Sequence, residues 1–192
     1  MGRRNVQITS LSIPDVKLIQ PNKHGDSRGF FSETYKQSAL HDAGIDIAFV
    51  QDNHSMSTAA GTLRGLHFQT PPYAQTKLVR VTRGRIFDVA VDIRRGSPTF
   101  GQYVSAELSA DNWTQILIPI GFAHGLMTLE PDTEVLYKVC SPYSASHDAG
   151  LSWNDPDIGI SWPDMGRAPV LSPKDSALPS LASVISPFEL AR

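Results

Sequence analysis

Apolar and polar residues alternate along much of this chain. The clearest case is residues 87–94, FDVAVDIR, in which every second side chain is apolar. Because successive side chains of a strand point to opposite faces, this period predicts a strand with one apolar and one polar face. Similar runs lie at Asp15–Ile19, Thr62–Gln69, Lys77–Val81, Tyr103–Leu108, Gln115–Pro119 and Thr133–Val139, with Gly-, Pro- or Asn-containing turns between several of them. Short strands separated by turns predict a β-sandwich or barrel.

Helix signals are few. Ser32 suits the N-cap of a helix that runs through Leu40 and ends before Gly44. A second helix is expected at Ser172–Pro173, because serine caps helices and proline suits the first helical position. We expect one domain over residues 1–192, with a β-core at about 15–140 and with loops and a short helix at 141–192.

Composition and charge narrow the function. The 192 residues are 41% hydrophobic and 19% charged, with a net charge of −2 and a pI near 6.3. No long basic run is present, which argues against nucleic acid or an anionic membrane as a partner. The most apolar segment, Ile116–Met127, is interrupted by Pro119 and is too short to span a bilayer. The N-terminal MGRRNVQITS lacks the apolar core of a signal peptide, so we expect a soluble cytoplasmic protein.

A polar cluster occupies residues 61–80, GTLRGLHFQTPPYAQTKLVR. His67 is a candidate base, since imidazole exchanges protons near pH 7, although a lone strand histidine is more often a packed residue. Arg64 and Lys77 are cations that would hold an anionic intermediate or a phosphate. Arg64 and His67 are three residues apart, so a regular strand would point them to opposite faces. A bulge at Gly65 would turn both inward, unless Arg64 precedes the regular pairing.

Other candidates have structural explanations of equal weight. Tyr137 lies on one strand face with Val135 and Val139, which is typical of a core aromatic residue. Asp175 follows the expected cap Ser172 by three residues, as in a capping box. His124 follows a proline-glycine turn at an expected strand edge, where it could reach a ligand or a metal. Asp88, on the polar face of its strand, competes with Asp175 as a partner for His67.

A metal site is the main alternative for this pattern. Metal-binding β-barrels of the cupin type carry an HxH motif that is followed by a glutamate and a further histidine. Here His67-Phe68-Gln69 supplies the first histidine, and Gln69 stands in the place of the second. An amide oxygen is a poorer ligand for transition metals than imidazole, so we expect no metal.

Several motifs in order resemble the dTDP-4-dehydrorhamnose 3,5-epimerase family. They are QDNHS at 51–55, RGLHFQ at 64–69, KLVR at 77–80, DVAVDIR at 88–94, SPTFG at 97–101, IP and GFAHG at 118–125, YK at 137–138 and WNDP at 153–156. So many motifs at compatible spacing argue against chance. The resemblance implies an all-β, cupin-like jelly-roll barrel (a double-stranded β-helix) with a few short peripheral helices. It also implies a homodimer that works without metal or organic cofactor.

The resemblance further implies the reaction. The substrate would be dTDP-4-dehydro-6-deoxy-D-glucose, whose C4 ketone acidifies the hydrogens at C3 and C5, and the product would be dTDP-4-dehydro-L-rhamnose. By resemblance, His67 is the base, and Asp175 orients its ring and stabilises the imidazolium. Tyr137 is the acid that returns a proton from the opposite face, and Lys77 stabilises the enolate oxygen at C4.

Substrate contacts also follow from the resemblance. The residues concerned are Arg28, Glu33, Gln51, Asp52, Asn53, Arg64, Gln69, His124, Tyr143, Asp148 and Lys174. Tyr143 would stack on thymine, and arginine suits the diphosphate because its planar fork grips two oxygens. For Arg28, Glu33 and Lys174, a solvated surface position is the alternative.

The chain departs from the family pattern at a few positions. Asp148 stands where the family usually has glutamate, and Leu126 where an aromatic residue commonly follows the glycine. The polar pair Ser146-His147 lies in a loop expected near the base, so these positions would tune substrate choice.

Three other functions stay open at the level of sequence. An enzyme that inverts C3 alone or C5 alone would keep the same base and acid. A metal-dependent cupin enzyme would bind iron, manganese or zinc and lose activity with a chelator. A noncatalytic sugar-binding barrel would tolerate the loss of His67.

Overall fold

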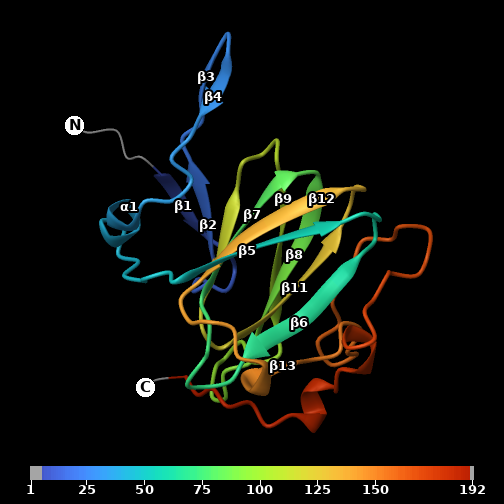
Figure 1. The fold of residues 1–192 in the computed structure, drawn as a ribbon. Coiled ribbons are helices and arrows are strands. Elements are labelled where there is room, and N and C mark those ends of the chain that lie inside the picture. The colour runs from blue at the N-terminus through green and yellow to red at the C-terminus, as the bar shows by residue number, and fades with distance from the viewer. Residues whose placement is uncertain (1–5, 191–192) are drawn as a thin grey trace.

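The protein is a β-barrel made of two antiparallel sheets that face each other (Figure 1). The structure, a computed structural model, describes residues 6–190, so part of the N-terminal stretch considered above lies outside the described residues. The first sheet contains, in spatial order, β1 (Val6–Ser10), β2 (Lys17–Pro21), β10 (Gln115–Ile118), β7 (Lys77–Arg83), β12 (Thr133–Val139) and β5 (Gln51–Ser57). The second contains β13 (Asp148–Gly150), β6 (Leu63–Gln69), β11 (Phe122–Thr128), β8 (Arg85–Asp92) and β9 (Tyr103–Ser109). This is the expected jelly-roll architecture.

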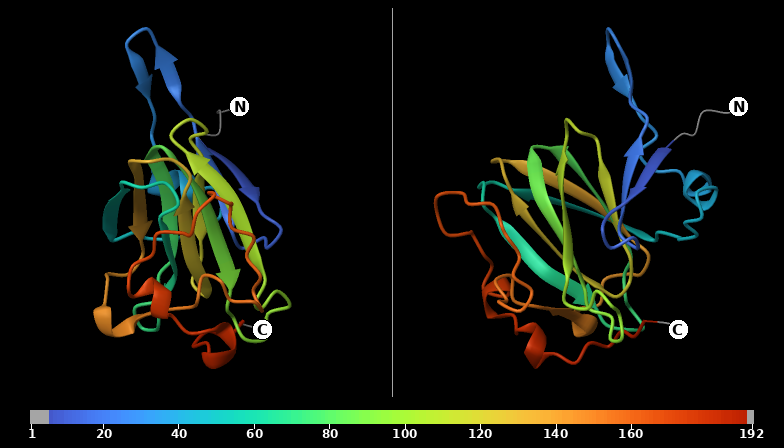
Figure 2. Two further views of the ribbon diagram at one scale, coloured as in Figure 1. Left: turned by 90° about the vertical axis from the view of Figure 1, so that its right-hand side faces the viewer. Right: turned by 180° about the vertical axis from the view of Figure 1, so that it is seen from behind.

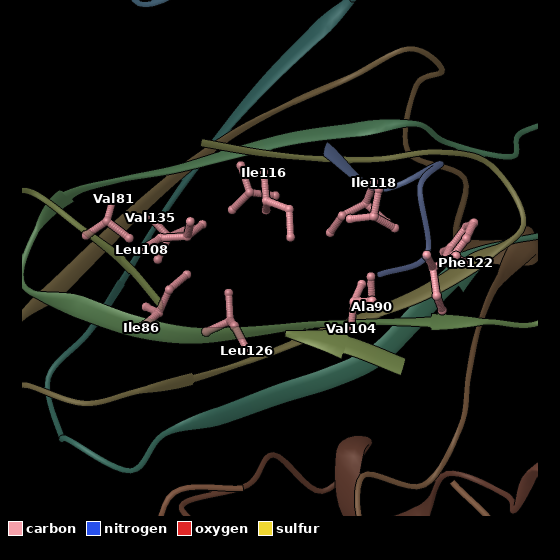
Figure 3. Packing of buried hydrophobic residues seen from close by; sticks show 13 residues of the cluster. Val81, Ile86, Ala90, Val104, Leu108, Ile116, Ile118, Phe122, Leu126 and Val135 are labelled. Atoms are coloured by element: carbon pink, nitrogen blue, oxygen red, sulfur yellow. The ribbon is translucent and has the colours of Figure 1, made fainter. Parts of the chain in front are cut away.

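The main core fills the space between the sheets. Val81 and Ile116 of the first sheet pack toward Ile86, Val104 and Leu126 of the second (Figure 3). Removing these side chains from water is the main stabilising contribution of the barrel. The interior is therefore closed by apolar contacts over part of its length, which leaves the remainder for a polar cavity.

Strand β8 is buried on both faces, which differs from the simple expectation for its alternating sequence. Its apolar row, including Val89 and Val91, faces outward. The C-terminal segment, residues 140–190, covers this row through Leu151 and Phe188. The row that contains Asp88 faces the barrel interior. The polar face predicted from the sequence is thus the inner face, because the chain after β12 folds back over the outside of the sheet.

The C-terminal segment contains three single turns of 3-10 helix, η1 (Ala145–His147), η2 (Asp175–Ala177) and η3 (Leu181–Ser183). The expected helix after Ser172 is therefore a short turn rather than a full helix. Apart from these turns and β13, most of the segment runs as loop along one end and the outside of the barrel, in orange to red in Figure 1. Within residues 6–190, no helix is long and apolar enough to cross a membrane.

Helix α1 (Gln37–His41) is shorter than predicted, because Ser32 does not cap it. The Ser32 hydroxyl instead accepts a hydrogen bond from Trp113 Nε1 at 3.0 Å. Just before Ser32, β3 (His24–Asp26) and β4 (Gly29–Phe31) form a hairpin that extends away from the barrel (Figures 1 and 2). Phe31 on this hairpin is 68% exposed.

Candidate active site

A cavity of about 330 Å³ opens between the two sheets. Its lining side chains come from strands of both sheets and from the C-terminal segment. They are Ser55, Arg64, His67, Phe68, Gln69, Gln75, Lys77, His124, Leu126, Tyr137, Tyr143, Asp148, Ser172, Lys174 and Asp175. All four residues predicted to be catalytic therefore lie around one cavity, although they come from β6, β7, β12 and the start of η2.

His67 and Asp175 form a close pair. His67 Nε2 lies 2.5 Å from Asp175 Oδ1, and the aspartate is buried. The other carboxylate oxygen, Oδ2, accepts a hydrogen bond from the Ser172 hydroxyl at 2.7 Å, and the same hydroxyl accepts the Asp175 backbone N–H at 3.0 Å. Asp175 thus both closes its local turn and holds the histidine ring, and Asp88 is not the partner of His67.

The surroundings of His67 favour a neutral ring. Burial lowers its pKa below the ordinary value, and the ammonium groups of Lys77 and Lys174 lower it further, while Asp175 opposes the shift. A ring that is neutral near pH 7 has a lone pair free to accept a proton. Because Nε2 is bonded to Asp175, Nδ1 is the nitrogen left for that proton.

Lys77 reaches into the cavity from the start of β7. Its Nζ donates to the His67 carbonyl oxygen at 3.4 Å. Burial lowers the pKa of Lys77 to about 8. The carboxylates of Asp88 and Asp148 offset part of this decrease, whereas the Lys174 ammonium adds to it. The side chain remains mostly an ammonium at neutral pH, and it can stabilise a developing negative charge in the cavity.

Tyr137 reaches the same cavity from β12, which pairs with β7 beside Lys77. Its ring also packs against the main core, so the predicted core role and a position in the site are both present. Burial raises the pKa of the Tyr137 hydroxyl above its usual range. The phenol is therefore protonated at neutral pH and is a proton donor.

A bulge in β6 explains how Arg64 and His67, three residues apart, face the same cavity. In the pairing of β6 with β11, His67 is opposite His124, whereas Arg64 is opposite Leu126, so the register shifts between them. Gly65 lies at this shift with φ of 126°, and a Cβ there would meet Gly125 Cα at 2.6 Å. The close contact of two glycines lets both polar side chains of β6 face the cavity, as the bulge prediction required.

Two cavity residues are held by fixed partners. His124 Nε2 lies 2.9 Å from Asp88 Oδ2. Gln69 donates to the carbonyl oxygens of Tyr73 and Pro142 and accepts the Ser144 N–H. Its amide thus fixes the loop after β12 to β6.

Three side chains form the rim of the cavity. The Tyr143 hydroxyl donates to Asp148 Oδ2 at 3.1 Å, and the Lys174 ammonium donates to the same oxygen. Tyr143 is 60% exposed, so its ring is accessible for stacking. The ion pair of Asp148 with Lys174 links β13 to the turn that carries Asp175.

The structure does not bring every predicted contact residue to this cavity. Arg28 and Glu33 lie on and beside the projecting hairpin, where they pair with Asp26 and Lys36. Asp52 forms an ion pair with Lys138 at 2.8 Å and lines a different hollow with Asn53.

Gln51 lies close to the rim. Its side-chain oxygen accepts the Tyr143 N–H at 3.1 Å, and its amide nitrogen donates to Asn53 Oδ1 at 2.8 Å. Gln51 and Asn53 therefore support the loop that carries Tyr143.

Some lining residues were not predicted from the sequence as site residues. Ser55 ends the QDNHS motif but was not singled out, Gln75 belongs to no quoted motif, and Ser172 was recognised as a cap alone. Within residues 6–190, no three His, Cys, Asp or Glu side chains are grouped so as to hold a metal ion.

An antiparallel jelly-roll barrel with a histidine–aspartate pair, a protonated phenol and an ammonium group around one cavity defines a cupin-like protein with an acid–base site. Comparison with known proteins identifies the family. Residues 10–183 match the family described as dTDP-4-dehydrorhamnose 3,5-epimerase. The dTDP-4-dehydrorhamnose 3,5-epimerase of Sinorhizobium fredii is 56% identical over 183 residues, which cover 95% of this chain and 93% of that protein.

Solved structures agree. The dTDP-4-dehydrorhamnose 3,5-epimerase of Bacillus anthracis, crystallised with TDP and PPi, matches with a TM-score of 0.88 and 51% identity over 91% of this chain and 99% of that one. The dTDP-6-deoxy-D-glucose-3,5-epimerase of Legionella pneumophila, in complex with dTDP-4-keto-L-rhamnose, matches with a TM-score of 0.92 and 42% identity over 97% and 100%. The chain belongs to the dTDP-4-dehydrorhamnose 3,5-epimerase family and is an isomerase.

Proposed function

We propose that this protein inverts C3 and C5 of dTDP-4-dehydro-6-deoxy-D-glucose and yields dTDP-4-dehydro-L-rhamnose, in dTDP-L-rhamnose or related deoxysugar biosynthesis. The observation that carries the proposal is the placement of the His67–Asp175 pair, Lys77 and Tyr137 around one cavity. The Legionella relative, crystallised with dTDP-4-keto-L-rhamnose, supports the choice of substrate.

The proposed chemistry consists of proton transfers. The C4 ketone makes the neighbouring C–H bonds acidic, so His67 removes a proton and the electron pair moves onto the C4 oxygen as an enolate. The Lys77 ammonium stabilises this oxygen, and Tyr137 then protonates the carbon from the opposite face. Each inversion leaves His67 protonated and Tyr137 ionised, so both exchange a proton with water before the next inversion.

The remaining contacts position the nucleotide. Arg64 and Lys174 supply positive charge suited to the diphosphate, and His124 adds a polar ring beside them. The exposed Tyr143 suits stacking on thymine. Every step uses side chains of the protein, so we propose that no metal or organic cofactor takes part. We also place the enzyme in the cytoplasm, in keeping with its single cysteine, Cys140.

We propose a homodimer in which the β3–β4 hairpin of one protomer reaches the cavity of the other. Arg28 and Glu33 are expected to contact substrate, yet within their own chain they lie away from the cavity lining. The hairpin extends from the barrel, and its Phe30 and Phe31 side chains are 55% and 68% exposed. In the dimer, the partner subunit would cover these rings, and Arg28 would reach the diphosphate bound in the partner's cavity.

The experiment for the reaction uses deuterium. The purified protein is incubated with dTDP-4-dehydro-6-deoxy-D-glucose in D2O, and C3 and C5 are followed by NMR. Deuterium at both centres with product of the L-lyxo configuration is the expected result. Exchange at one centre alone would show a single-centre epimerase, and loss of activity with a chelator would show a metal-dependent enzyme. The absence of any exchange would contradict the proposal.

A further inference from the structure

Asp88 is an unusual residue for the interior of a barrel. It lies in the middle of β8, has no exposed surface, and stands in the inward row between Ile86 and Ala90 of the main core. Its Oδ2 is bonded to His124, while Oδ1 is buried without a hydrogen-bond partner among residues 6–190. Burial of an incompletely bonded carboxylate is costly, so a position of this kind calls for a functional reason.

The neighbours of Asp88 supply that reason. His124, its hydrogen-bond partner, is opposite His67 in the pairing of β11 with β6. Two histidine–aspartate pairs therefore stand side by side at the cavity wall. Asp88 is also the carboxylate that most strongly favours the charged form of Lys77.

We propose that Asp88 is a positioning residue of the active site, whose carboxylate orients the His124 ring and serves as a counter-charge of Lys77. The proposal rests on the roles given above to Lys77 and His124. Asp88 is not among the residues that line the cavity, so it acts through these two side chains. The cost of its burial is offset by the fixed orientation of the His124 ring and by the charged form of Lys77, which suits an anion.

The charges around Lys77 fix the sign of the expected effect. Asp88 from β8 and Asp148 from β13 favour the ammonium, whereas burial and Lys174 oppose it. The other titratable side chains of the cavity lining are Arg64, His67, His124, Tyr137, Tyr143 and Asp175. The pKa shifts of His67 and Tyr137 leave both of these neutral at pH 7. Removing the Asp88 charge therefore lowers the pKa of Lys77 below its value of about 8.

The test is the pH dependence of kcat/KM for Asp88→Asn. In the wild type the alkaline limb is expected near the Lys77 pKa of about 8. In the variant this limb should move to lower pH, because a carboxylate that favours the Lys77 ammonium is lost. A residue that merely supported the fold would lower the thermal midpoint and leave this limb in place.

Asp92→Asn is the matched control. Asp92 lies on the same strand and is equally buried, but its partners are Arg94, Ser97 and Thr99, outside the cavity. The control is expected to lose stability while it keeps the wild-type alkaline limb.

A second variant and a direct measurement make the test decisive. Asp88→Thr also removes the charge and suits a strand, so it serves if the asparagine variant does not fold. In the wild type, ¹⁵N NMR of the His124 ring should find Nε2 protonated toward Asp88 at pH 7 to 8. An unshifted alkaline limb in either folded variant, or an unprotonated Nε2 in the wild type, would overturn the proposal.

Lys77→Met separates this inference from the proposed function. If Lys77→Met were as active as the wild type, the role of Lys77 in the reaction would fail. If Lys77→Met is inactive and Asp88→Asn keeps its alkaline limb, the role of Asp88 alone fails.

Discussion

His67 and Asp175 are 108 residues apart in the chain and meet in one hydrogen bond. The sequence predicted each of them separately, one from a polar cluster and the other from a capping pattern, and the family resemblance joined them. The structure explains how Asp175 serves two purposes, since its two oxygens bond different partners. The choice between Asp175 and Asp88 was beyond sequence reasoning, because it depends on which strands face each other across the barrel.

The role of Asp175 leads to a prediction for Asp175→Asn. The neutral amide no longer favours the protonated ring, so the pKa of His67, already lowered by burial, falls further and the acid limb of kcat/KM moves to lower pH. The imidazolium intermediate is less stable, and kcat should fall by about 10²–10⁴-fold. A pH–rate series measures both effects.

Ser172→Ala is the control for this prediction. It removes the hydrogen bond to Asp175 Oδ2 but keeps the carboxylate. It should cost roughly 0.5–2 kcal/mol of stability, as the loss of a cap does, with a far smaller effect on kcat. Equal losses of kcat in the two variants would argue against a catalytic role for the Asp175 charge.

At the scale of elements, alternation located the strands that build most of the barrel. The expected run at Thr133–Val139 coincides with β12, and those beginning at Lys77 and Tyr103 coincide with the starts of β7 and β9. Strand β5, QDNHSMS, was missed because both of its faces carry polar residues. The helix expected from Ser32 was wrong in its start, since long-range bonding to Trp113 outweighs local capping preference.

The bulge in β6 gives a prediction for Gly65→Ala. A Cβ would collide with the β11 backbone, and φ of 126° is unfavourable for alanine. We expect a loss of roughly 1–3 kcal/mol in the free energy of unfolding and a larger loss of kcat/KM, because β6 must move away from β11. Denaturant unfolding and steady-state kinetics provide the two values.

Gly96→Ala is the control for the bulge. Gly96 also has a positive φ, 79°, but a Cβ there meets nothing within 4 Å. It should lose about 1 kcal/mol and keep its activity. A Gly65→Ala protein no less stable than Gly96→Ala would mean that the close strand contact is not needed.

At the scale of the whole molecule, the C-terminal segment and the β3–β4 hairpin have positions that the alternation of apolar and polar residues does not predict. The segment supplies Asp148, Ser172, Lys174 and Asp175 to the cavity, and it covers the outer face of the second sheet. Its irregular sequence predicted loop, but not the face that the loop would cover. The hairpin places Arg28 away from its own cavity, which is why the proposed dimer matters for function.

Mixed dimers test that arrangement. Arg28→Ala should raise KM by about 10- to 100-fold through a lost charged hydrogen bond, and His67→Asn should abolish turnover. If Arg28 acts in the partner's cavity, mixing and refolding the two variants restores sites that have both residues intact. Activity that stays at the level of the separately refolded variants would place Arg28 outside the partner's cavity.

The central claim is that an imidazole base and a phenol acid act on the same sugar across one cavity. Its most direct test is to measure deuterium exchange and product formation together in D2O for His67→Asn and Tyr137→Phe. We predict that His67→Asn stops both, and that Tyr137→Phe slows product formation more than exchange of label at C3 and C5. Equal slowing of exchange and product in Tyr137→Phe, or exchange that continues in His67→Asn, would contradict the account.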